Sequence, residues 1–336
     1  MTRPPRPPYP TGLKPYGSAL VELARTRPEV VCLSADLTRQ CEVDLFRDAL
    51  PERFFNVGMA EQNMMGIAGA LARQGHIPYV HTFGVFCTRH AYDQVAMAIA
   101  YPNLPVRLIG FMPGLSSPGG PSHQAIDDVA LMRALPNMTV IDVADAVEVR
   151  QVVHAIAALP GPVYVRLKRG EIPIMFDDDR HFDLERAQVL QPGADLCLIA
   201  AGMMLPAALV AADALAERGL EVGVLNVPVV KPLDAATVLE ACRGTRGVVV
   251  AENHTIVGGL GSAVAEALAE AGLGVRLRRV GIPDRFAEAG SVDHLFERHG
   301  LTTQHIVSVA WELAGGRGEA PAAASPAAPA GSYAPV

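Results

Sequence analysis

A single glutamate, Glu61, stands where a carboxyl group could do chemistry. The run FFNVGMAEQNMMGIAGALARQG predicts a buried strand, a tight turn at Gly58 and a helix whose first turn contains Glu61. Met59, Met64 and Met65 surround it in the sequence. One interpretation is that the carboxylate only complements the helix dipole, which is worth under about 1 kcal/mol at an exposed site. The other is a carboxyl group in apolar surroundings, with a raised pKa, that shares a proton with a ligand nitrogen.

Aromatic, imidazole and guanidinium side chains later in the chain offer further chemistry. Phe83 and Phe86 lie three residues apart in HTFGVF, a spacing typical of ordinary core packing. His123 follows a Gly-Gly-Pro turn and is either a plain loop residue or, with an ordinary pKa of about 6.5, a group that moves protons. Arg169 ends a predicted strand in VRLKRGEIP, where it is either solvated or a donor to a phosphate or carboxylate.

A glycine-bearing segment near the end of the chain, ENHTIVGGLGSAVAEAL, follows a predicted strand and opens a helix, as anion-binding loops do. It lacks the full GxGxxG spacing, so the pattern is a weak indication of a dinucleotide site. We assign no catalysis to Gly258, Gly259 and Gly261, and no chemistry to Glu252 or His254.

The composition limits the classes of partner. The 336 residues are half apolar and carry a net charge of −7 without a basic block, which argues against nucleic acid or an anionic membrane as the main partner. The five cysteines stand far apart with no CxxC pair, a pattern typical of reduced thiols, so we expect a cytoplasmic location. No apolar stretch has the length of a signal peptide core or a membrane span. A soluble enzyme that acts on small molecules is therefore the expectation.

Apolar runs of strand length alternate with helical patterns along the chain. VVCLSA, HIPYVHTF, VRLIGFM and VYVRLKR are strand-like, whereas GSALVELART and DAVEVRQVVHAIAAL have helical periodicity. This alternation predicts an α/β fold of two doubly wound domains, each with a mostly parallel sheet covered by helices. The predicted organisation is an extended proline-rich arm at 1–15, a first domain at 16–172, a linker at 173–193, a smaller second domain at 194–314 and a disordered tail at 315–336.

Several of these segments, taken together, resemble the transketolase family. LSADLTRQ, RFFNVGMAEQNMMGIAGALA, HTFGVF, GPSHQAIDDVALMRALPNMTV and VYVRLKRGEIP follow one another in the order and approximate spacing of that family, over roughly residues 17–315. Each segment alone is a weak signal, but the set is specific. The resemblance implies a thiamine diphosphate pyrimidine-binding domain followed by the transketolase C-terminal domain.

The resemblance also implies cofactor roles. Glu61 takes the position of the glutamate that hydrogen-bonds N1′ of the cofactor's aminopyrimidine, where a shared proton favours the imino form that produces the carbanion nucleophile. Phe83 and Phe86 match the aromatic stack under the pyrimidine ring. Asp36 and its neighbour Leu37 match positions at the cofactor. The cofactor performs the bond making and breaking, while the protein supplies orientation and proton control.

On the substrate side, the resemblance implies transfer of a two-carbon ketol unit from a ketose donor to an aldehyde acceptor. His123 matches a residue near the reacting centre, so we expect it to be catalytic together with the glutamate. Arg169 matches an arginine that binds substrate phosphate.

Four positions depart from the common pattern of the family. Gly119 stands where typical members have an aspartate that reads a sugar hydroxyl, and Phe111 stands where many have a phosphate-binding histidine. Gln40 and Arg89 replace a serine and a tyrosine. We count Gln40, Arg89 and Gly119 as substrate-side positions, and we infer that the cofactor chemistry is kept while the substrate differs. A specialised ketose, a ketose with another acid group and a 2-oxo acid donor all stay open.

A partner chain is expected from what the sequence lacks. Typical members carry a GDG motif, followed some distance on by Asn, in an earlier domain that holds the divalent metal and the diphosphate, and no GDG occurs in this chain. The proline-rich start is too short to cradle a diphosphate against a cation. We therefore expect thiamine diphosphate and Mg²⁺ to be held largely by a partner subunit in an α2β2 assembly. No metal ligand is assigned to this chain, and we expect little or no activity without the partner.

Other functions stay open at this point. The β subunit of a 2-oxo acid dehydrogenase, or a related acyl-transferring synthase, shares the glutamate and the domain order, although SADLT, AEQNM and GPSHQ are closer to transketolase. A non-catalytic scaffold subunit would need none of Glu61, Phe83, Phe86 and His123. A NAD-binding enzyme is suggested by the doubly wound pattern alone, without the expected fingerprint.

Overall fold

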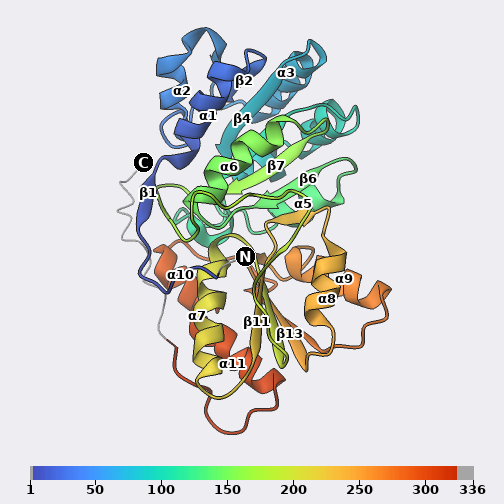
Figure 1. Ribbon diagram of the computed structural model, residues 1–336. Coiled ribbons are helices and arrows are strands. Elements are labelled where there is room, and N and C mark those ends of the chain that lie inside the picture. The colour runs from blue at the N-terminus through green and yellow to red at the C-terminus, as the bar shows by residue number, and fades with distance from the viewer. Residues whose placement is uncertain (1–2, 324–336) are drawn as a thin grey trace.

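Two mostly parallel sheets, one in each half of the chain, organise the protein (Figure 1). The structure is a computed structural model, and it describes residues 3–323. Within those residues the strands of the first sheet lie in the spatial order β12 (Val229–Lys231), β6 (Thr139–Asp142), β7 (Val163–Leu167), β5 (Arg107–Phe111), β4 (Ile77–Phe83), β2 (Val30–Ser34) and β3 (Phe54–Asn56). All of them run parallel except β12, which pairs antiparallel with β6.

Helices cover both faces of this first sheet, because its central strands are apolar on both sides. In β2, Val31 and Leu33 face a core shared with α3 (Glu61–Arg73), the helical segment 86–100 and α5 (Asp128–Ala134). Val30 and Cys32 point to the opposite face, where α1 (Pro15–Thr26) and α6 (Ala146–Ala157) pack. The segment 86–100 comprises η2 (Phe86–His90), α4 (Tyr92–Gln94) and η3 (Val95–Ala100), and α2 (Asp44–Ala49) and η1 (Pro51–Arg53) lie before β3.

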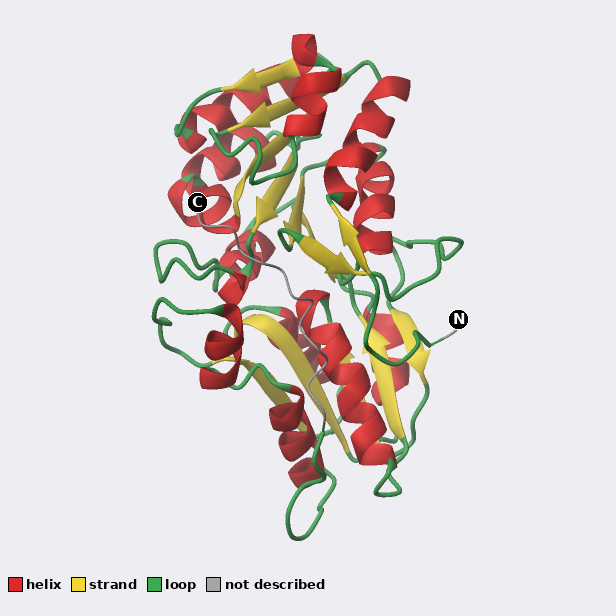
Figure 2. Ribbon diagram, turned by 90° about the vertical axis from the view of Figure 1, so that its left-hand side faces the viewer, coloured by secondary structure: helices red, strands yellow, loops and turns green. Residues whose placement is uncertain are grey.

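The second sheet has the spatial order β14 (Leu277–Ile282), β13 (Gly247–Thr255), β10 (Leu196–Ala200), β11 (Val222–Asn226) and β9 (Gln188–Gln191), and only β9 runs antiparallel. After the short turn η5 (Gly202–Met204), α7 (Leu205–Ala216) packs with α11 (Thr303–Leu313) on one face. On the other face lie α8 (Ala235–Cys242) and α9 (Leu260–Glu270). Figure 2 shows helices on both sides of the strands in each half. The predicted α/β fold class is confirmed.

The two halves are joined by more than a linker. Strand β12 comes from the second half of the chain but completes the edge of the first sheet. Near the start, β1 (Thr11–Leu13) pairs with β8 (Glu171–Pro173), and Arg3 and Arg6 reach Asp213 of α7 at 2.6 and 3.1 Å. The predicted linker includes β9, whereas the predicted tail lies beyond residue 323 for most of its length, outside the described residues. The exact domain boundaries stay a prediction.

Two local expectations were wrong. The FFNVG run forms β3, but this strand lies at the sheet edge, where Phe55 is 41% exposed and Asn56 is also exposed. An edge strand packs on one neighbour only, so an apolar run there need not be buried. Met59 was expected to be one of three methionines around Glu61, but Met59 is 84% exposed. The other two, Met64 and Met65, are fully buried.

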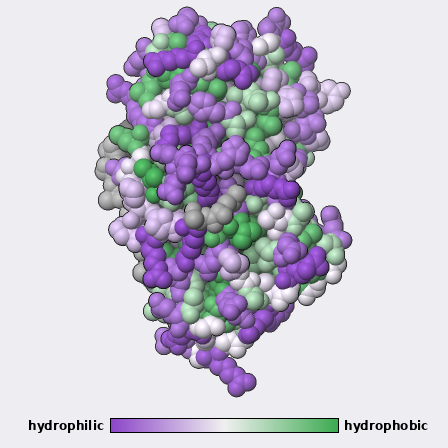
Figure 3. All heavy atoms as spheres, in the orientation of Figure 1, coloured by the Kyte–Doolittle hydropathy of each residue, from purple (hydrophilic) through white to green (hydrophobic). Residues whose placement is uncertain are grey.

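The surface of the molecule is mostly polar in the view of Figure 3, where apolar side chains appear in small groups. Within residues 3–323, the structure has no helix with the length and apolar character needed to cross a membrane.

Candidate active site

The candidate residues from separate parts of the sequence gather at one edge of the first sheet. Asp36 follows β2, Glu61 follows β3 and Phe86 follows β4. His123 lies in the segment after β5, and Arg169 lies two residues after β7. Because these strands are parallel, their carboxyl ends meet at the same edge, which is the usual ligand-binding edge of an open α/β sheet.

Glu61 is the first residue of α3, and only 6% of it is exposed. Its Oε1 accepts a long hydrogen bond of 3.4 Å from Thr82 Oγ1 at the end of β4. Its Oε2 lies 3.8 Å from Nε2 of His90, a residue that is half exposed. Both contacts are longer than the 2.7–2.8 Å typical of a hydroxyl or charge-assisted hydrogen bond. The carboxylate is therefore buried but still able to bond strongly to a ligand.

An aromatic cluster lies at the end of β4. The rings of Phe83 and Phe86 are stacked, with centroids 6.1 Å apart and an angle of 24° between planes. The imidazole of His123 packs edge-on against both, with centroid distances of 6.4 Å to Phe83 and 5.3 Å to Phe86. Ser122 Oγ lies 2.9 Å from Nδ1 of His123, which leaves Nε2 as the nitrogen open for proton exchange. The structure thus brings together an aromatic platform and an imidazole, and β4 also contributes Thr82 to the Glu61 carboxylate.

The turn before Glu61 is fixed by a side-chain network. Asn56 Oδ1 accepts from the backbone N–H of Asp36 and of Gly58, both at 3.1 Å, and its amide donates to Asp36 Oδ1 at 3.1 Å. Asp36 has a φ of +60°, which its short polar side chain tolerates. Leu37 is half-buried, and its N–H bonds to Ser34 Oγ at 3.3 Å. These bonds tie the end of β2 to the turn that presents Glu61.

The substrate-side candidates have different surroundings. Gly119 lies under His123, because a Cβ added there would be 3.0 Å from the His123 Cβ and 3.1 Å from its Cγ. Gln40 and Arg169 are half-buried and have no hydrogen-bond or ion-pair partner within residues 3–323. Phe111 is fully buried in the core, edge-on to Tyr16 at 5.6 Å.

Arg89 turns toward the chain itself. Its Nη2 donates to the carbonyl oxygens of Pro121 at 3.2 Å and Gln124 at 2.6 Å, and its Nε lies 3.2 Å from Asp127 Oδ1. These partners flank the histidine that belongs to the aromatic cluster.

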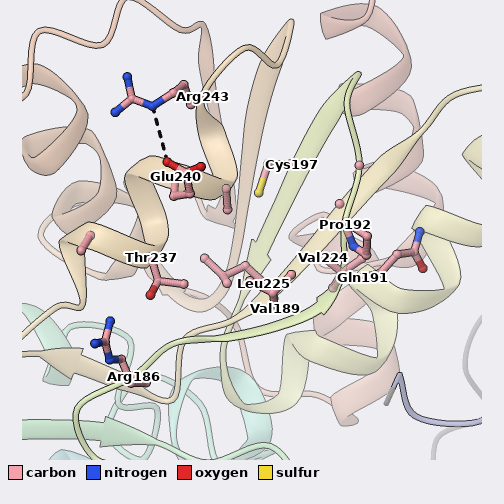
Figure 4. A pocket seen from close by; sticks show the side chains of 14 residues that line it. Arg186, Val189, Gln191, Pro192, Cys197, Val224, Leu225, Thr237, Glu240 and Arg243 are labelled. Atoms are coloured by element: carbon pink, nitrogen blue, oxygen red, sulfur yellow. Dashed lines mark ion pairs between the residues drawn. The ribbon is translucent and has the colours of Figure 1, made fainter. Parts of the chain in front are cut away.

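A separate hollow of about 480 Å³ lies on the second half of the molecule, between β9, β11 and α8 (Figure 4). Its wall includes Val189, Leu225 and Cys197, and the Arg243–Glu240 ion pair stands at its border. No predicted site residue lines it. This hollow therefore has no link to the predicted site residues, and we place the candidate site at the carboxyl edge of the first sheet.

Comparison with known proteins decides the family. Residues 11–175 match the transketolase pyrimidine-binding domain, and residues 185–306 match the transketolase C-terminal domain. The chain belongs to the transketolase family. This confirms the family resemblance of the sequence motifs and the order of the two domains.

Individual members of the transketolase family match nearly the whole chain. An uncharacterized transketolase family protein of Sinorhizobium fredii is 46% identical, over 89% of this chain and 88% of that protein. The 6-deoxy-6-sulfo-D-fructose transketolase subunit of a Clostridium strain is 41% identical, over 89% and 92%. A solved structure described as a split-gene transketolase, an inactive β4 tetramer, superimposes with a TM-score of 0.84 at 41% identity and covers 90% of this chain and 97% of that one.

The transketolase family depends on thiamine diphosphate, and the geometry suits the pyrimidine half of that cofactor. A planar, nitrogen-containing ring needs an aromatic face and a carboxyl group at its edge. The stacked pair Phe83 and Phe86 offers such a face, and Glu61 offers a buried carboxyl with unused bonding capacity.

Sequence reasoning missed a buried network that joins the two halves. Arg166 donates to Asp128 at 2.8 Å, to Asp142 at 2.6 Å and to the carbonyl oxygen of Asn253 at 2.8 Å. The side chain of Asn253 accepts from the N–H of Leu115 at 2.9 Å. Burial raises the pKa of Asp142, and Arg166 opposes that rise. An arginine in the middle of the apolar run VYVRL was the available signal, since a charge in a buried strand needs a partner.

Two more residues near Glu61 were also missed. Thr82 and His90 both contact its carboxylate, and Gln62 Nε2 donates to the carbonyl oxygen of His90 at 3.1 Å. Neither contact has a pattern in the sequence, because each depends on how α3 packs against β4 and η2.

Proposed function

We propose that this chain is the pyrimidine-binding and C-terminal subunit of a split transketolase that moves a two-carbon ketol unit from a ketose to an aldehyde. The observation that carries the proposal is the end of β4, where Thr82 bonds to the buried carboxylate of Glu61 and the next residue, Phe83, stacks on Phe86. The transketolase domains on both sides of this site support the same reaction class.

Within that reaction, Glu61 would bond to N1′ of the aminopyrimidine, and Phe83 and Phe86 would hold the ring. Asp36 and Leu37 would line the cofactor from the end of β2. When bound, thiamine diphosphate supplies a carbanion nucleophile that no side chain of the protein can supply. The protein contributes orientation and the placement of protons at the Glu61 carboxylate.

His123 is proposed as the second catalytic residue. Its Nδ1 faces Ser122, so Nε2 is the atom that would take up or release a proton near the aromatic platform. Histidine suits this task because an imidazole nitrogen can both accept and donate a proton.

The partner in this proposal is a chain with the GDG…N motif, which would hold the diphosphate and Mg²⁺ in an α2β2 assembly. The names of two relatives support a divided enzyme, since one is a transketolase subunit and the other is an inactive β4 tetramer from a split gene. Exposed apolar side chains beside the packed helices α3 and η3 also support a covering chain, namely Met59, Met97 and Tyr101.

The proposed donor is a ketose with an acidic substituent. Arg169 follows β7 at the same sheet edge and has no ion-pair partner within residues 3–323, so its permanent charge suits a phosphate or another acid group. The departures at Gly119 and Gln40 support a sugar other than the usual ones. One relative, at 41% identity, is a 6-deoxy-6-sulfo-D-fructose transketolase subunit.

The test begins with calorimetric titration of thiamine diphosphate and Mg²⁺ into this chain alone, and then into its mixture with a GDG…N partner chain. We expect tight binding only in the mixture. That complex should then transfer ketol units from a panel of phosphorylated, sulfonated and neutral ketoses to a common aldehyde. Consumption of a 2-oxo acid with no ketose turnover would contradict the transketolase assignment, and tight binding to this chain alone would contradict the division of the site.

We also propose a cytoplasmic location, because all five cysteines are buried free thiols. Fractionation of cells that express a tagged chain would check it, and recovery outside the cytoplasm would contradict it.

A further inference from the structure

The segment that carries His123 lacks regular structure of its own. It runs from the turn η4 (Gly114–Ser116) to α5 and contains a Gly-Gly-Pro sequence. Gly120, in its middle, has a φ of +75°, a conformation that glycine adopts without strain. A loop of this kind needs anchors from outside if an imidazole on it is to keep one position.

Arg89 supplies such anchors from η2, the helical turn that follows β4. Its bonds to the carbonyl oxygens of Pro121 and Gln124 lie two residues before and one residue after His123. Its contact with Asp127 lies four residues after His123. The guanidinium group therefore brackets the imidazole on both sides along the chain.

The hydrogen bonds from Arg89 to the two carbonyl oxygens contribute more to holding the loop than the ion pair with Asp127 does. The Arg89 and Asp127 side chains are 30% and 34% exposed, so their charge attraction is partly screened by water. The bond to the Gln124 carbonyl, at 2.6 Å, is short and has a charged donor. Gln124 is also held from the second half of the molecule, because its Nε2 donates to the Glu288 carbonyl oxygen at 3.0 Å.

We propose that Arg89 is a positioning residue that holds the 117–127 loop so that His123 faces Phe86, and that it does not bind substrate directly; this rests on the proposed role of His123. The Nη2 of Arg89 donates to two carbonyl oxygens of the loop, and its Nε lies within ion-pair distance of Asp127. The planar guanidinium places Nη2 at the two carbonyls and Nε at the carboxylate in one fixed geometry, whereas a lysine has one nitrogen on a flexible stem and cannot occupy both places.

The site has little tolerance for movement of this loop. The His123 imidazole lies 5.3 Å from the Phe86 ring, and it also packs over the backbone of Gly119. A displacement of about 1 Å in a reacting group can cost as much as 10²-fold in rate. Loss of the Arg89 anchors should therefore lower turnover more than binding.

The first experiment compares Arg89→Met, Arg89→Lys and the control Arg243→Met in the complete complex with partner and cofactor. Arg243 forms an exposed ion pair with Glu240 on the second half, so its loss should leave the rate unchanged. For Arg89→Met we expect kcat to fall by roughly 30-fold, within the range for a misplaced group, with the donor KM and cofactor affinity within about twofold. Arg89→Lys should recover part of kcat. A raised KM with unchanged kcat would overturn the proposal, because it would indicate direct substrate contact.

A double-mutant cycle with His123→Ala provides the sharper readout. If Arg89 acts through His123, adding Arg89→Met to His123→Ala should change kcat by less than about twofold. Losses that multiply would overturn the proposal.

Hydrogen exchange on the chain alone separates this proposal from the proposed function. Arg89→Met should speed amide exchange in 117–127 by about tenfold or more and leave α1 unchanged, because only the loop loses its anchors. Unchanged exchange in the loop would overturn the anchoring. If the loop loosens but the wild-type complex transfers no ketol unit from any donor, the proposed function and the catalytic consequence fail, while the anchoring stands.

Discussion

Each half of the molecule buries a glutamate beside the start of a helix: Glu61 is the first residue of α3, whereas Glu252 lies in β13 and its carboxylate faces the start of α9. The two carboxylates are bonded differently. Glu61 is 6% exposed and Glu252 is 3% exposed, so burial does not separate them. Glu252 accepts short bonds from the N–H groups of Leu260 and Gly261, at 2.7 and 3.0 Å, at the start of α9. Within the described part of the chain, the carboxylate of Glu61 has polar contacts at 3.4 and 3.8 Å and none shorter.

The hydrogen bonds of a buried carboxylate distinguish a structural role from a role in ligand binding or catalysis. Each carboxylate oxygen of Glu252 accepts one backbone N–H, so the N–H groups of Leu260 and Gly261 are already used and are not free for an anion. Glu61 is the first residue of α3, but its carboxylate accepts no hydrogen bond from the backbone N–H groups of that helix. Its oxygens can therefore still accept hydrogen bonds from another group. Unsatisfied bonding capacity in a buried group is costly unless a ligand uses it.

The largest expected effect comes from Glu61→Gln in the complete complex. Glutamine keeps the size of the side chain but cannot share a proton in the same way, so kcat should fall roughly 10³-fold. Assembly and the thermal midpoint should stay within about 2 °C, because no short bond is lost. Steady-state kinetics and a melting curve check this, with Glu240→Gln, on an exposed ion pair, as the matched control. Unchanged turnover would end the catalytic assignment.

Alanine substitutions in the two glycine turns, at Gly259 and at Gly58, should cost different amounts of unfolding free energy. A Cβ at Gly259 would lie 2.0 Å from Glu252 Oε2, so Gly259→Ala should cost roughly 2–4 kcal/mol of unfolding free energy. Gly58 has a φ of +74° and open space around its Cβ position, so Gly58→Ala should cost only about 1–2 kcal/mol of backbone strain. Urea unfolding of both variants measures the difference. Equal costs would mean that the Glu252 side chain can move aside.

The unfolding free energy of the protein should depend on pH in part through Glu252. Burial raises its pKa to about 7 from an ordinary 4.5, so the folded state holds the proton more tightly than the unfolded state. Its contribution to stability is complete below about pH 4.5 and is lost as the pH rises through 7. Glu42 and Glu148 have pKa values raised to about 7 by the same cause. Relative to the wild-type chain, Glu252→Gln should therefore lose less unfolding free energy, or gain more, between pH 4.5 and 7, and an unchanged slope would contradict this.

The smallest effect is expected at His90. Its side chain is 54% exposed and its Nε2 lies 3.8 Å from Glu61 Oε2, so a protonated imidazole interacts with the carboxylate through largely screened charge. His90→Gln should change kcat only about twofold to threefold. Steady-state kinetics test this, with the exposed His154→Gln on α6 as control. A loss as large as that of Glu61→Gln would make His90 part of the catalytic machinery.

Much of the fold followed from local sequence patterns. The runs VVCLSA, HIPYVHTF and VYVRLKR became β2, β4 and β7, since a strand buried on both faces must be apolar throughout. The grouping of Glu61, Phe83 and His123 followed from motif order, because the ends of parallel strands meet at one edge.

What the sequence could not predict depends on long-range pairing. Nothing in VVK indicated that β12 would join a sheet made by residues far earlier in the chain. The bonds of Arg89 to a loop over 30 residues later were also not predictable, because this contact has no local periodicity. The exposure of β3 was missed because an apolar run does not reveal whether its strand is central or at an edge.

Strand β12, which comes from the second half of the chain but completes the first sheet, has a consequence for synthesis of the protein. The last native partner of β6 emerges from the ribosome only when residue 231 does, long after β7 ends at residue 167. Until then β6 presents an open edge, the kind of surface that invites wrong pairing with another nascent chain. A fragment that stops at residue 175 would keep that edge permanently, so the first sheet depends on the second half of the chain to close it.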